Sequence, residues 1–470
     1  MKRLPLLALA TSAAICLLCA TAPAAPNIQQ DDLGPVPDTG QIAHQTTYVA
    51  ISPDCHDIAM VVKTDNDAEL RINGKSIATA DEISDVVFSP AGVRLAYAAR
   101  RGKTWYAVFD SQETSVGPSA PSNLLISPDA RHLFYLTATA DSQTAVVDGK
   151  PQKAYSQIAQ VTISFAGFHY AYAGLGNDSL WRVVRDGEET GQAYTSVRQI
   201  RFSRDGQQLA FVAANAAGES VQRDATVYGP YYRVTSPPAF SPDGEHLTFG
   251  AYQRAPGAPL DESGYPVLDA YRVVDGNAVK SAPTTQILYS YGAEGAHVLI
   301  AELHLLFNTN GTEFVYIDGL NCAGGGVTED VTLSPGGARF ACAGHGVLVI
   351  DNRRIGYLHH VGPPLFSPDS RRVAYATADD PSKIWSMNVD DDRLPDSLVL
   401  PTADFVNSKW LANTELTDQL SIDNGHSYNG QIPYHFDPDG TLVYFRIEGG
   451  HLYRVHWKPD GATALPTTRP

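Results

Sequence analysis

A short stretch of sequence is repeated along the whole chain. It reads AFSPDGEHLTFGA at 239–251, VFSPAGVRLAYAA at 87–99 and LFSPDSRRVAYAT at 365–377. In the first copy, Ser-Pro-Asp-Gly has the residues of a type I turn. The apolar residues after the turn alternate with other residues, which is typical of a strand with one buried face. The repeat therefore predicts a β-hairpin.

The spacing of the repeated serine shows how large one unit is. From the first copy to the sixth the gap is 37 to 39 residues, with the serine at Ser52, Ser89, Ser127, Ser164, Ser203 and Ser241. The motif returns at Ser334 and Ser367, and as Asp437 in FDPDG. Two weaker copies fit around Ser290 and Ser408. We therefore expect about eleven units.

A second hairpin lies inside each unit. RINGK, VVDGK and YIDGL place Asn-Gly or Asp-Gly between apolar runs, at 71–75, 146–150 and 316–320. Such pairs favour tight hairpins because glycine accepts positive φ. Four short strands in a repeat of close to forty residues are typical of a β-propeller blade. The sequence thus predicts an all-β chain of four-stranded blades.

The number of rings is left open at this point. Propellers have four to eight blades, so about eleven units suggest either two rings of about six plus five blades or one large ring. The first set of repeats spans 46–280 and the second spans 281–461. The period is broken near this boundary by QRAPGAPLDESGYPVLDA at 253–270.

The repeats resemble a known family. FSPDSRRVAYATADDPSKIWSMNVDD (366–391) and FDPDGTLVYFRIEGGHLYRVHWKPDG (436–461) are similar to the TolB-type, WD40-like β-propeller repeat. The resemblance covers nearly all of 46–461. The chain departs from it at ISFAG (163–167), which lacks the Pro and Asp, and around 280–320, where the period stretches. The resemblance implies an exported or periplasmic propeller that works through protein contacts, and it carries over no catalytic residue.

The N-terminal sequence predicts export. Lys2 and Arg3 precede an apolar run, and Ala22-Pro23-Ala24 matches a signal-peptidase site. We expect residues 1–24 to be a signal peptide cleaved after Ala24, which makes the protein periplasmic or secreted. No later run is long enough to span a membrane. We expect 25–45 to be a flexible lead-in and 462–470 a disordered tail, although a strand from one end could close the ring against the other.

Charge and cysteine content restrict the partners and the bonds. The net charge is −17, and loss of Lys2 and Arg3 with the signal peptide makes it −19. An acidic chain is repelled by phosphate backbones, so nucleic acid is not expected as a partner. After cleavage Cys55, Cys322 and Cys342 are left. Cys322 and Cys342 could form a disulfide or stay as two buried thiols, and the oligomeric state is open.

The common catalytic motifs are missing. GHSYNG (425–430) lacks the second glycine of a nucleophile elbow. His359-His360 and the His451, His456 pair do not have the spacing of metal ligands on a strand. We predict no catalytic, cofactor-binding or metal-binding residue, and a structural Ca²⁺ on the propeller axis stays open. The sequence favours a protein that is not an enzyme.

One excursion from the repeat is the candidate binding loop. Residues 252–268 replace a short turn by a Pro- and Gly-containing segment with mixed aromatic and charged residues. The loop could also be an idle insertion. Our leading hypothesis is a soluble propeller scaffold that binds a protein or an envelope component through loops on one face. The alternative is a channel-centred ligand-binding protein or a lyase- or lactonase-like enzyme with a site built from several blades. The candidate binding residues are Tyr252, Arg254, Asp261, Glu262 and Tyr265.

Overall fold

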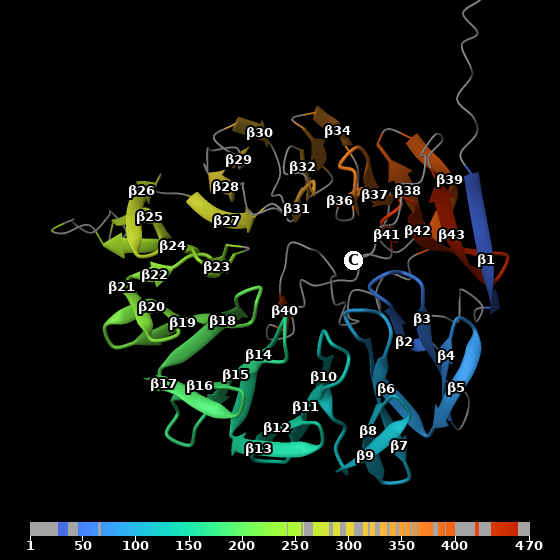
Figure 1. Cartoon of the computed structure of the whole chain (residues 1–470), viewed down its shortest axis with the longest axis horizontal. Coiled ribbons are helices and arrows are strands. Elements are labelled where there is room, and N and C mark those ends of the chain that lie inside the picture. The colour runs from blue at the N-terminus through green and yellow to red at the C-terminus, as the bar shows by residue number, and fades with distance from the viewer. Residues whose placement is uncertain are drawn as a thin grey trace, which may run out of the picture.

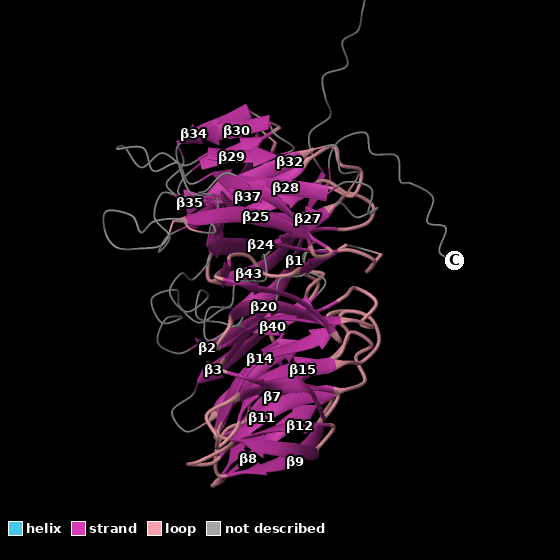
Figure 2. Ribbon diagram, turned by 90° about the vertical axis from the view of Figure 1, so that its left-hand side faces the viewer, coloured by secondary structure: helices cyan, strands magenta, loops and turns pink. Residues whose placement is uncertain are grey.

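The strands of the protein were located in a computed structural model. It describes residues 27–35, 46–63, 67–241, 243–254, 257, 267–281, 285–291, 298–304, 314–317, 320–324, 330–335, 339–344, 347–351, 353–357, 360–361, 364–378, 384–390, 392–399, 419–422 and 434–458. These residues form strands joined by turns and loops, without a helix (Figure 2). The prediction of an all-β chain is confirmed.

The strands form ten antiparallel sheets, numbered here in chain order. The first five are β2(Thr46–Ile51) β3(Ile58–Lys63) β4(Ala68–Ile72) β5(Lys75–Ala80); β6(Glu82–Phe88) β7(Leu95–Arg101) β8(Thr104–Phe109) β9(Gln112–Gly117); β10(Ser122–Ile126) β11(Leu133–Ala138) β12(Gln143–Val147) β13(Lys150–Tyr155); β14(Gln157–Ser164) β15(Tyr170–Leu175) β16(Trp181–Arg185) β17(Glu188–Tyr194); and β18(Ser196–Phe202) β19(Leu209–Asn215) β20(Gly218–Arg223) β21(Thr226–Tyr231).

The sixth to ninth sheets are β22(Arg233–Val234) β23(Ala239–Phe240) β24(Leu247–Arg254) β25(Leu268–Val274) β26(Asn277–Ser281); β27(Thr285–Tyr291) β28(Val298–His304) β29(Phe314–Ile317) β30(Leu320–Gly324); β31(Asp330–Leu333) β32(Phe340–Gly344) β33(Val347–Ile350) β34(Arg353–Tyr357); and β35(His360–Val361) β36(Leu365–Phe366) β37(Val373–Ala378) β38(Ile384–Val389) β39(Asp392–Val399). The tenth is β41(Tyr434–Phe436) β42(Leu442–Glu448) β43(His451–Lys458), with β1(Asn27–Pro35) as its fourth strand. The predicted four-stranded blades are confirmed.

The repeated serine builds the first hairpin of a sheet. Its side chain is buried in all eight copies that keep the serine and whose burial is described: Ser52, Ser89, Ser127, Ser164, Ser203, Ser241, Ser334 and Ser367. In the fifth sheet the Ser203 hydroxyl donates to Asp205 Oδ1 at 2.5 Å and accepts the Gln208 amide at 2.9 Å. The serine is repeated because it satisfies a buried amide inside the turn.

The Asp of the second hairpin ties the two turns together. Its backbone has a left-handed φ of 47° to 53° at Asp110, Asp148, Asp186, Asp224, Asp275, Asp351 and Asp390. Asp accepts this conformation better than most residues. In the sixth sheet Asp275 Oδ1 accepts the Leu247 amide of the second strand at 2.8 Å. One carboxylate thus joins the Asp-Gly turn to the strand that leaves the Ser-Pro-Asp-Gly turn.

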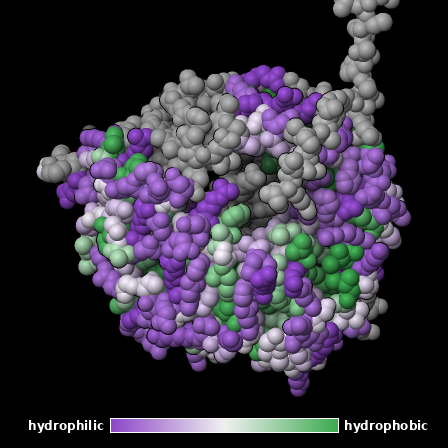
Figure 3. Space-filling view, viewed as in Figure 1, coloured by the Kyte–Doolittle hydropathy of each residue, from purple (hydrophilic) through white to green (hydrophobic). Residues whose placement is uncertain are grey.

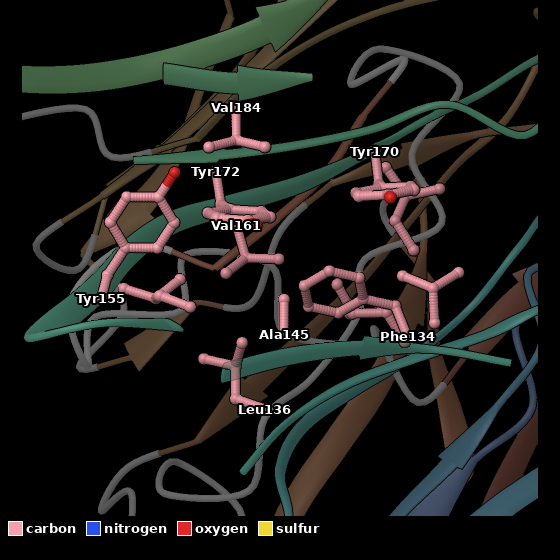
Figure 4. Packing of buried hydrophobic residues seen from close by; sticks show 12 residues of the cluster. Phe134, Leu136, Ala145, Tyr155, Val161, Tyr170, Tyr172 and Val184 are labelled. Atoms are coloured by element: carbon pink, nitrogen blue, oxygen red, sulfur yellow. The ribbon is translucent and has the colours of Figure 1, made fainter. Parts of the chain in front are cut away.

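Apolar side chains join eight pairs of neighbouring sheets in the described part of the chain. In Figure 1 the sheets lie side by side around a common centre, in chain order from β2 to β43. Between the third and fourth sheets, Phe134 and Leu136 face Tyr170 and Tyr172 (Figure 4). Similar clusters join the tenth sheet to the first, each of the first five to the next, the eighth to the ninth, and the ninth to the tenth. The sheets thus bury the faces that a single blade leaves open.

Two features of the arrangement differ from the sequence expectations. Residues 27–35 of the expected flexible lead-in form β1, which pairs with β43 from Asn27 opposite Lys458 to Pro35 opposite His451. The reason is that the last unit supplies three strands only, so its third strand needs a partner. The N-terminal and C-terminal segments therefore share one sheet. This agrees with the alternative expectation that a strand from one end of the chain could pair with the other end.

The second difference concerns the number of units. The unit around Ser408 lies outside the described residues, and the segment between β39 and β41 contributes β40(Gln419–Ile422). This strand pairs with β14, with Val161 opposite Ile422 and Ser164 opposite Gln419, and so extends the inner edge of the fourth sheet. The described chain therefore has ten sheets where about eleven were expected. The boundary near 280, the signal peptide 1–24 and the tail 462–470 stay predictions.

Candidate functional site

The candidate binding loop starts and ends on the sixth sheet. Tyr252 and Arg254 lie at the end of β24, and Arg254 is paired with Leu268 at the start of β25. The loop between them covers 255–267, whereas the corresponding loops cover 102–103 in the second sheet and 216–217 in the fifth. Asp261, Glu262 and Tyr265 lie outside the described residues. The structure thus places two of the five candidate residues at the base of the loop.

Exposed aromatic, basic and aliphatic side chains surround this base. We call Tyr232, Arg233, Tyr252, Arg254 and Val267 the rim. Tyr232 is 52% exposed and Val267 is 45% exposed, and both arginines are exposed. The Tyr232 amide donates to the Tyr252 carbonyl at 2.9 Å, and Arg233 is the cross-strand neighbour of Tyr252. The rim therefore combines residues from the link before the sixth sheet with residues at the two ends of the 255–267 loop.

The charge at the rim is positive. Nearby Asp269 is paired with Lys280, whose ammonium lies 2.8 Å from Asp269 Oδ1, and this contact raises the pKa of Lys280. Within the described residues neither Arg233 nor Arg254 has a carboxylate partner. The rim thus has two arginines and two tyrosines at one edge of the sheet. Arginine and tyrosine are among the residue types that contribute most of the binding energy in protein interfaces.

Sequence reasoning missed Tyr232, Arg233 and Val267. Tyr232 lies in the link between the fifth and sixth sheets, twenty residues before Tyr252, and Arg233 is the first residue of β22. The run YYRV at 231–234 was the available signal, because it places two adjacent tyrosines and an arginine at the junction between the fifth and sixth sheets. Their proximity to Tyr252 depends on strand register, which the spacing of the repeat does not give.

Polar side chains also recur on the innermost strands. Four sheets have a β-bulge there, with a left-handed residue four positions before the repeated serine: Asp85, Asn123, Gln160 and Gln199. Gln160 Oε1 accepts the Gln199 amide of the next sheet at 2.5 Å. This bond gives the bulge a structural use, which is to join neighbouring inner strands. The channel-centred alternative stays a prediction.

Of the three cysteines left after cleavage, the structure describes the side chain of Cys55 alone. Cys322 lies on β30 of the seventh sheet and Cys342 on β32 of the eighth, and both side chains lie outside the described residues. Their disulfide stays a prediction. Cys55 is a buried thiol outside any disulfide, and burial raises its pKa. A buried thiol of this kind acts as a small apolar residue.

The two histidines of β43 lie close to carboxylates of β1. His451 Nδ1 lies 2.9 Å from Asp32 Oδ2, and His456 Nε2 lies 3.4 Å from Asp31 Oδ2. In the described part of the chain, no group of three or more His, Cys, Asp or Glu side chains is arranged to hold a metal ion. The same residues include no helix long and apolar enough to cross a membrane. A structural Ca²⁺ on the axis stays a prediction.

Comparison with known proteins gives likenesses of fold. No family model matches the chain, and no curated protein matches it. Among solved structures, the Dos1 propeller matches with 10% identity over 75% of this chain and 93% of its own, at a TM-score of 0.31. A TolB structure from Agrobacterium tumefaciens matches with 16% identity over 53% of this chain and 93% of its own, at a TM-score of 0.24. The structure of a eukaryotic initiation factor matches with 10% identity over 74% of this chain and 86% of its own, at a TM-score of 0.42. A TolB and a propeller are thus among the matches, and the fold itself rests on the strand pairing above.

Proposed function

We propose that this protein is an exported β-propeller scaffold that binds another protein, or an envelope component, at the rim of its sixth sheet. The observation that carries the proposal is the gathering of exposed Tyr232, Arg233, Arg254 and Val267 at the base of the 255–267 loop. Long loops on a rigid scaffold are common binding sites. The predicted signal peptide is the basis for placing the partner in the periplasm or outside the cell.

The composition of the rim sets the kind of partner. Of the exposed large apolar residues in the described chain, four lie on the fifth and sixth sheets or directly beside their strands: Val227, Tyr232, Val267 and Val279. The face of the molecule seen in Figure 3 is mainly hydrophilic, with hydrophobic residues in separate groups. Tyrosine, arginine and valine together fit an apolar protein surface with an acidic border better than a nucleic acid, which the net charge of −17 would repel.

The test is affinity capture from an envelope extract with matched variants. The tagged protein should retain one stoichiometric partner by mass spectrometry, and Tyr232→Ala with Arg233→Ala should weaken the purified complex by a factor of about 30 or more, as expected for hot-spot residues. Deletion of 254–264 should do the same. Ile77→Ala is the matched control, because Ile77 is 49% exposed on the first sheet. Equal affinity in the rim variants and the control would contradict the proposal.

A further inference from the structure

The first turn of the tenth sheet departs from the other turns at the position of the repeated serine. In the eight serine copies described above, the serine Oγ accepts the backbone amide five residues later, at 2.8 to 3.1 Å. In five of them the hydroxyl also donates to the Asp two residues later: Ser52, Ser127, Ser203, Ser241 and Ser367. The tenth sheet has Asp437 at this position. A hydroxyl that both accepts and donates is thus replaced by a carboxylate.

The tenth turn is also one residue shorter than the others. The Ser241 amide donates to the carbonyl of His246, five residues later. The Asp437 amide donates to the carbonyl of Thr441, only four residues later. The missing residue is the one whose amide would donate to the side chain at 437, and the Thr441 amide donates to Asp439 Oδ1 at 2.9 Å. Within the described residues, no N–H or O–H group therefore donates to the Asp437 carboxylate.

This carboxylate lies at the joint between the tenth and first sheets. Asp437 is half-buried, and its charge acts on the buried Cys55 thiol in the first Ser-Pro-Asp turn. His56 of the same turn and His456 of β43 have their ring centroids 6.4 Å apart. Both rings, together with His435 of β41, lie near enough to Asp437 to favour its charged form. The joint thus places three groups that can be protonated around one carboxylate.

The other charged groups of this joint have partners of their own. Lys458 Nζ lies 2.8 Å from Asp439 Oδ2. Arg454 Nη2 donates to Asp31 Oδ2 at 2.7 Å. Asp54 Oδ1 accepts the hydroxyl of the serine in its own turn at 2.6 Å. Asp437 differs from these carboxylates because its turn supplies it with no donor.

The surroundings of Asp437 favour its neutral form. Burial raises its pKa above 3.8 and Asp439 raises it further, although the three histidines act in the opposite direction. A group whose folded pKa is raised stabilises the fold fully below its unfolded value, and this contribution is lost as the pH rises through the folded value. The ionised carboxylate therefore leaves the joint weaker at neutral pH than in acid. Asp205 behaves in the opposite way, because the Ser203 hydroxyl lowers its pKa.

We propose that Asp437 is a proton-operated switch, which holds the joint between the tenth and first sheets more firmly when its carboxyl group is protonated. A protonated carboxyl has an O–H donor, as the serine hydroxyl has in the other turns, and Asp439 is the acceptor two residues later. Protonation of the surrounding histidines acts in the same direction, because a charged imidazole attracts a carboxylate. The switch goes beyond the proposed partner binding, because it acts where β1 completes the tenth sheet and not at the rim.

Asp437→Asn tests the switch, because the amide keeps the size of the side chain and cannot ionise. At about pH 7.5 the variant should melt at a higher temperature than the native protein, and the difference should shrink as the pH falls to about 4. Hydrogen exchange of the β1 amides should be slower in the variant by about threefold or more at about pH 7.5, and equal near pH 4. Asp437→Ser, which restores the residue of the other turns, should behave in the same way.

Asp205→Asn, in the equivalent turn of the fifth sheet, is the control with the opposite sign. Asp205 Oδ1 accepts the Ser203 hydroxyl at 2.5 Å and the Gln207 amide at 3.0 Å. This variant should therefore melt below the native protein at about pH 7.5 and approach it as the pH falls below 3.8. It should leave the exchange of the β1 amides unchanged. A melting difference between the native protein and both Asp437 variants that does not vary with pH, or equal β1 exchange in all of them, would overturn the proposal.

Discussion

Single carboxylates in the Asp-Gly turns have two separate tasks. Asp275 Oδ1 accepts the Leu247 amide at 2.8 Å, while Oδ2 lies 2.6 Å from His246 Nδ1. The first sheet shows that the two tasks can be separated, because Asn73 Oδ1 accepts the Ile58 amide there without a carboxylate. Hydrogen bonding and charge from Asp275 raise the pKa of His246 above 6.5. The oxygen that builds the sheet is thus distinct from the one that charges the histidine.

Asp275→Asn should lower the pKa of His246 toward its ordinary value and still fold, because the amide keeps the Oδ1 contact. The raised folded pKa stabilises the protein below pH 6.5, and this contribution is lost as the pH rises through the folded value. The difference in unfolding free energy between the native protein and the variant should therefore shrink above pH 6.5. NMR titration of the His246 ring measures the shift. Asp148→Asn, in the third sheet, is the control, and an unchanged His246 titration in Asp275→Asn would refute the argument.

At the scale of strands and hairpins, arginines fasten one sheet to the next turn. Arg223, at the end of β20, donates to the carbonyls of Gly244 and Glu245 in the Ser-Pro-Asp-Gly turn of the sixth sheet, each at 3.0 Å. Its guanidinium also lies over the Phe240 ring, 5.7 Å from the centroid. Arg185 reaches the carbonyls of Gly206 and Gln207 in the same way, and Arg339 those of Ser370 and Arg371. Turn carbonyls at the joints are thereby satisfied by the preceding sheet.

Arg223→Lys should reduce the free energy of unfolding by about 1 to 3 kcal/mol, because an ammonium cannot bond both carbonyls and stack on the ring at once. Urea unfolding measures this loss. Arg131→Lys is the matched control, because Arg131 is exposed in an equivalent turn of the third sheet, and it should change stability by less than about 0.5 kcal/mol. Equal midpoints for both variants would show that the arginine contributes little to the joint.

Strand content and hairpin positions were predictable because each turn is encoded locally. Ser203 accepts the amide of Gln208, five positions later in its own turn, and Asp224 accepts the amide of Leu209, fifteen positions earlier in the same unit. What the sequence could not give is pairing over long separations. The contacts of β1 with β43 and of Tyr232 with Tyr252 depend on register between segments that share no motif.

At the scale of the whole molecule, the N-terminal strand completes the last sheet and seals it against the first. Leu33 of β1 is buried with Ile51 and Met60 of the first sheet and Phe445 of the tenth. Asp31 Oδ2 accepts from Arg454 Nη2 at 2.7 Å, and this bond lowers the pKa of Asp31. Arg454 also donates to the His56 carbonyl in the first Ser-Pro-Asp turn. The joint between the chain's two ends therefore repeats the arginine contact of the other joints and adds a strand.

A protein that starts at residue 36 should melt at a lower temperature and aggregate, because it loses the Leu33 packing and exposes the unpaired edge of β43.

A synthetic peptide of residues 25–35 added in trans should raise the melting temperature again, in proportion to its occupancy. The same peptide with Leu33→Ala should restore less, because it leaves a cavity in the joint. Since the folded pKa of Asp31 is lowered, the contribution of Asp31 to the benefit of the native peptide should be complete above pH 3.8 and should fall as the pH drops below 3.8 toward the folded pKa. Calorimetric melting of the truncated chain with each peptide decides the matter, and a truncated chain as stable as the native protein would mean that the ring does not depend on β1 for closure.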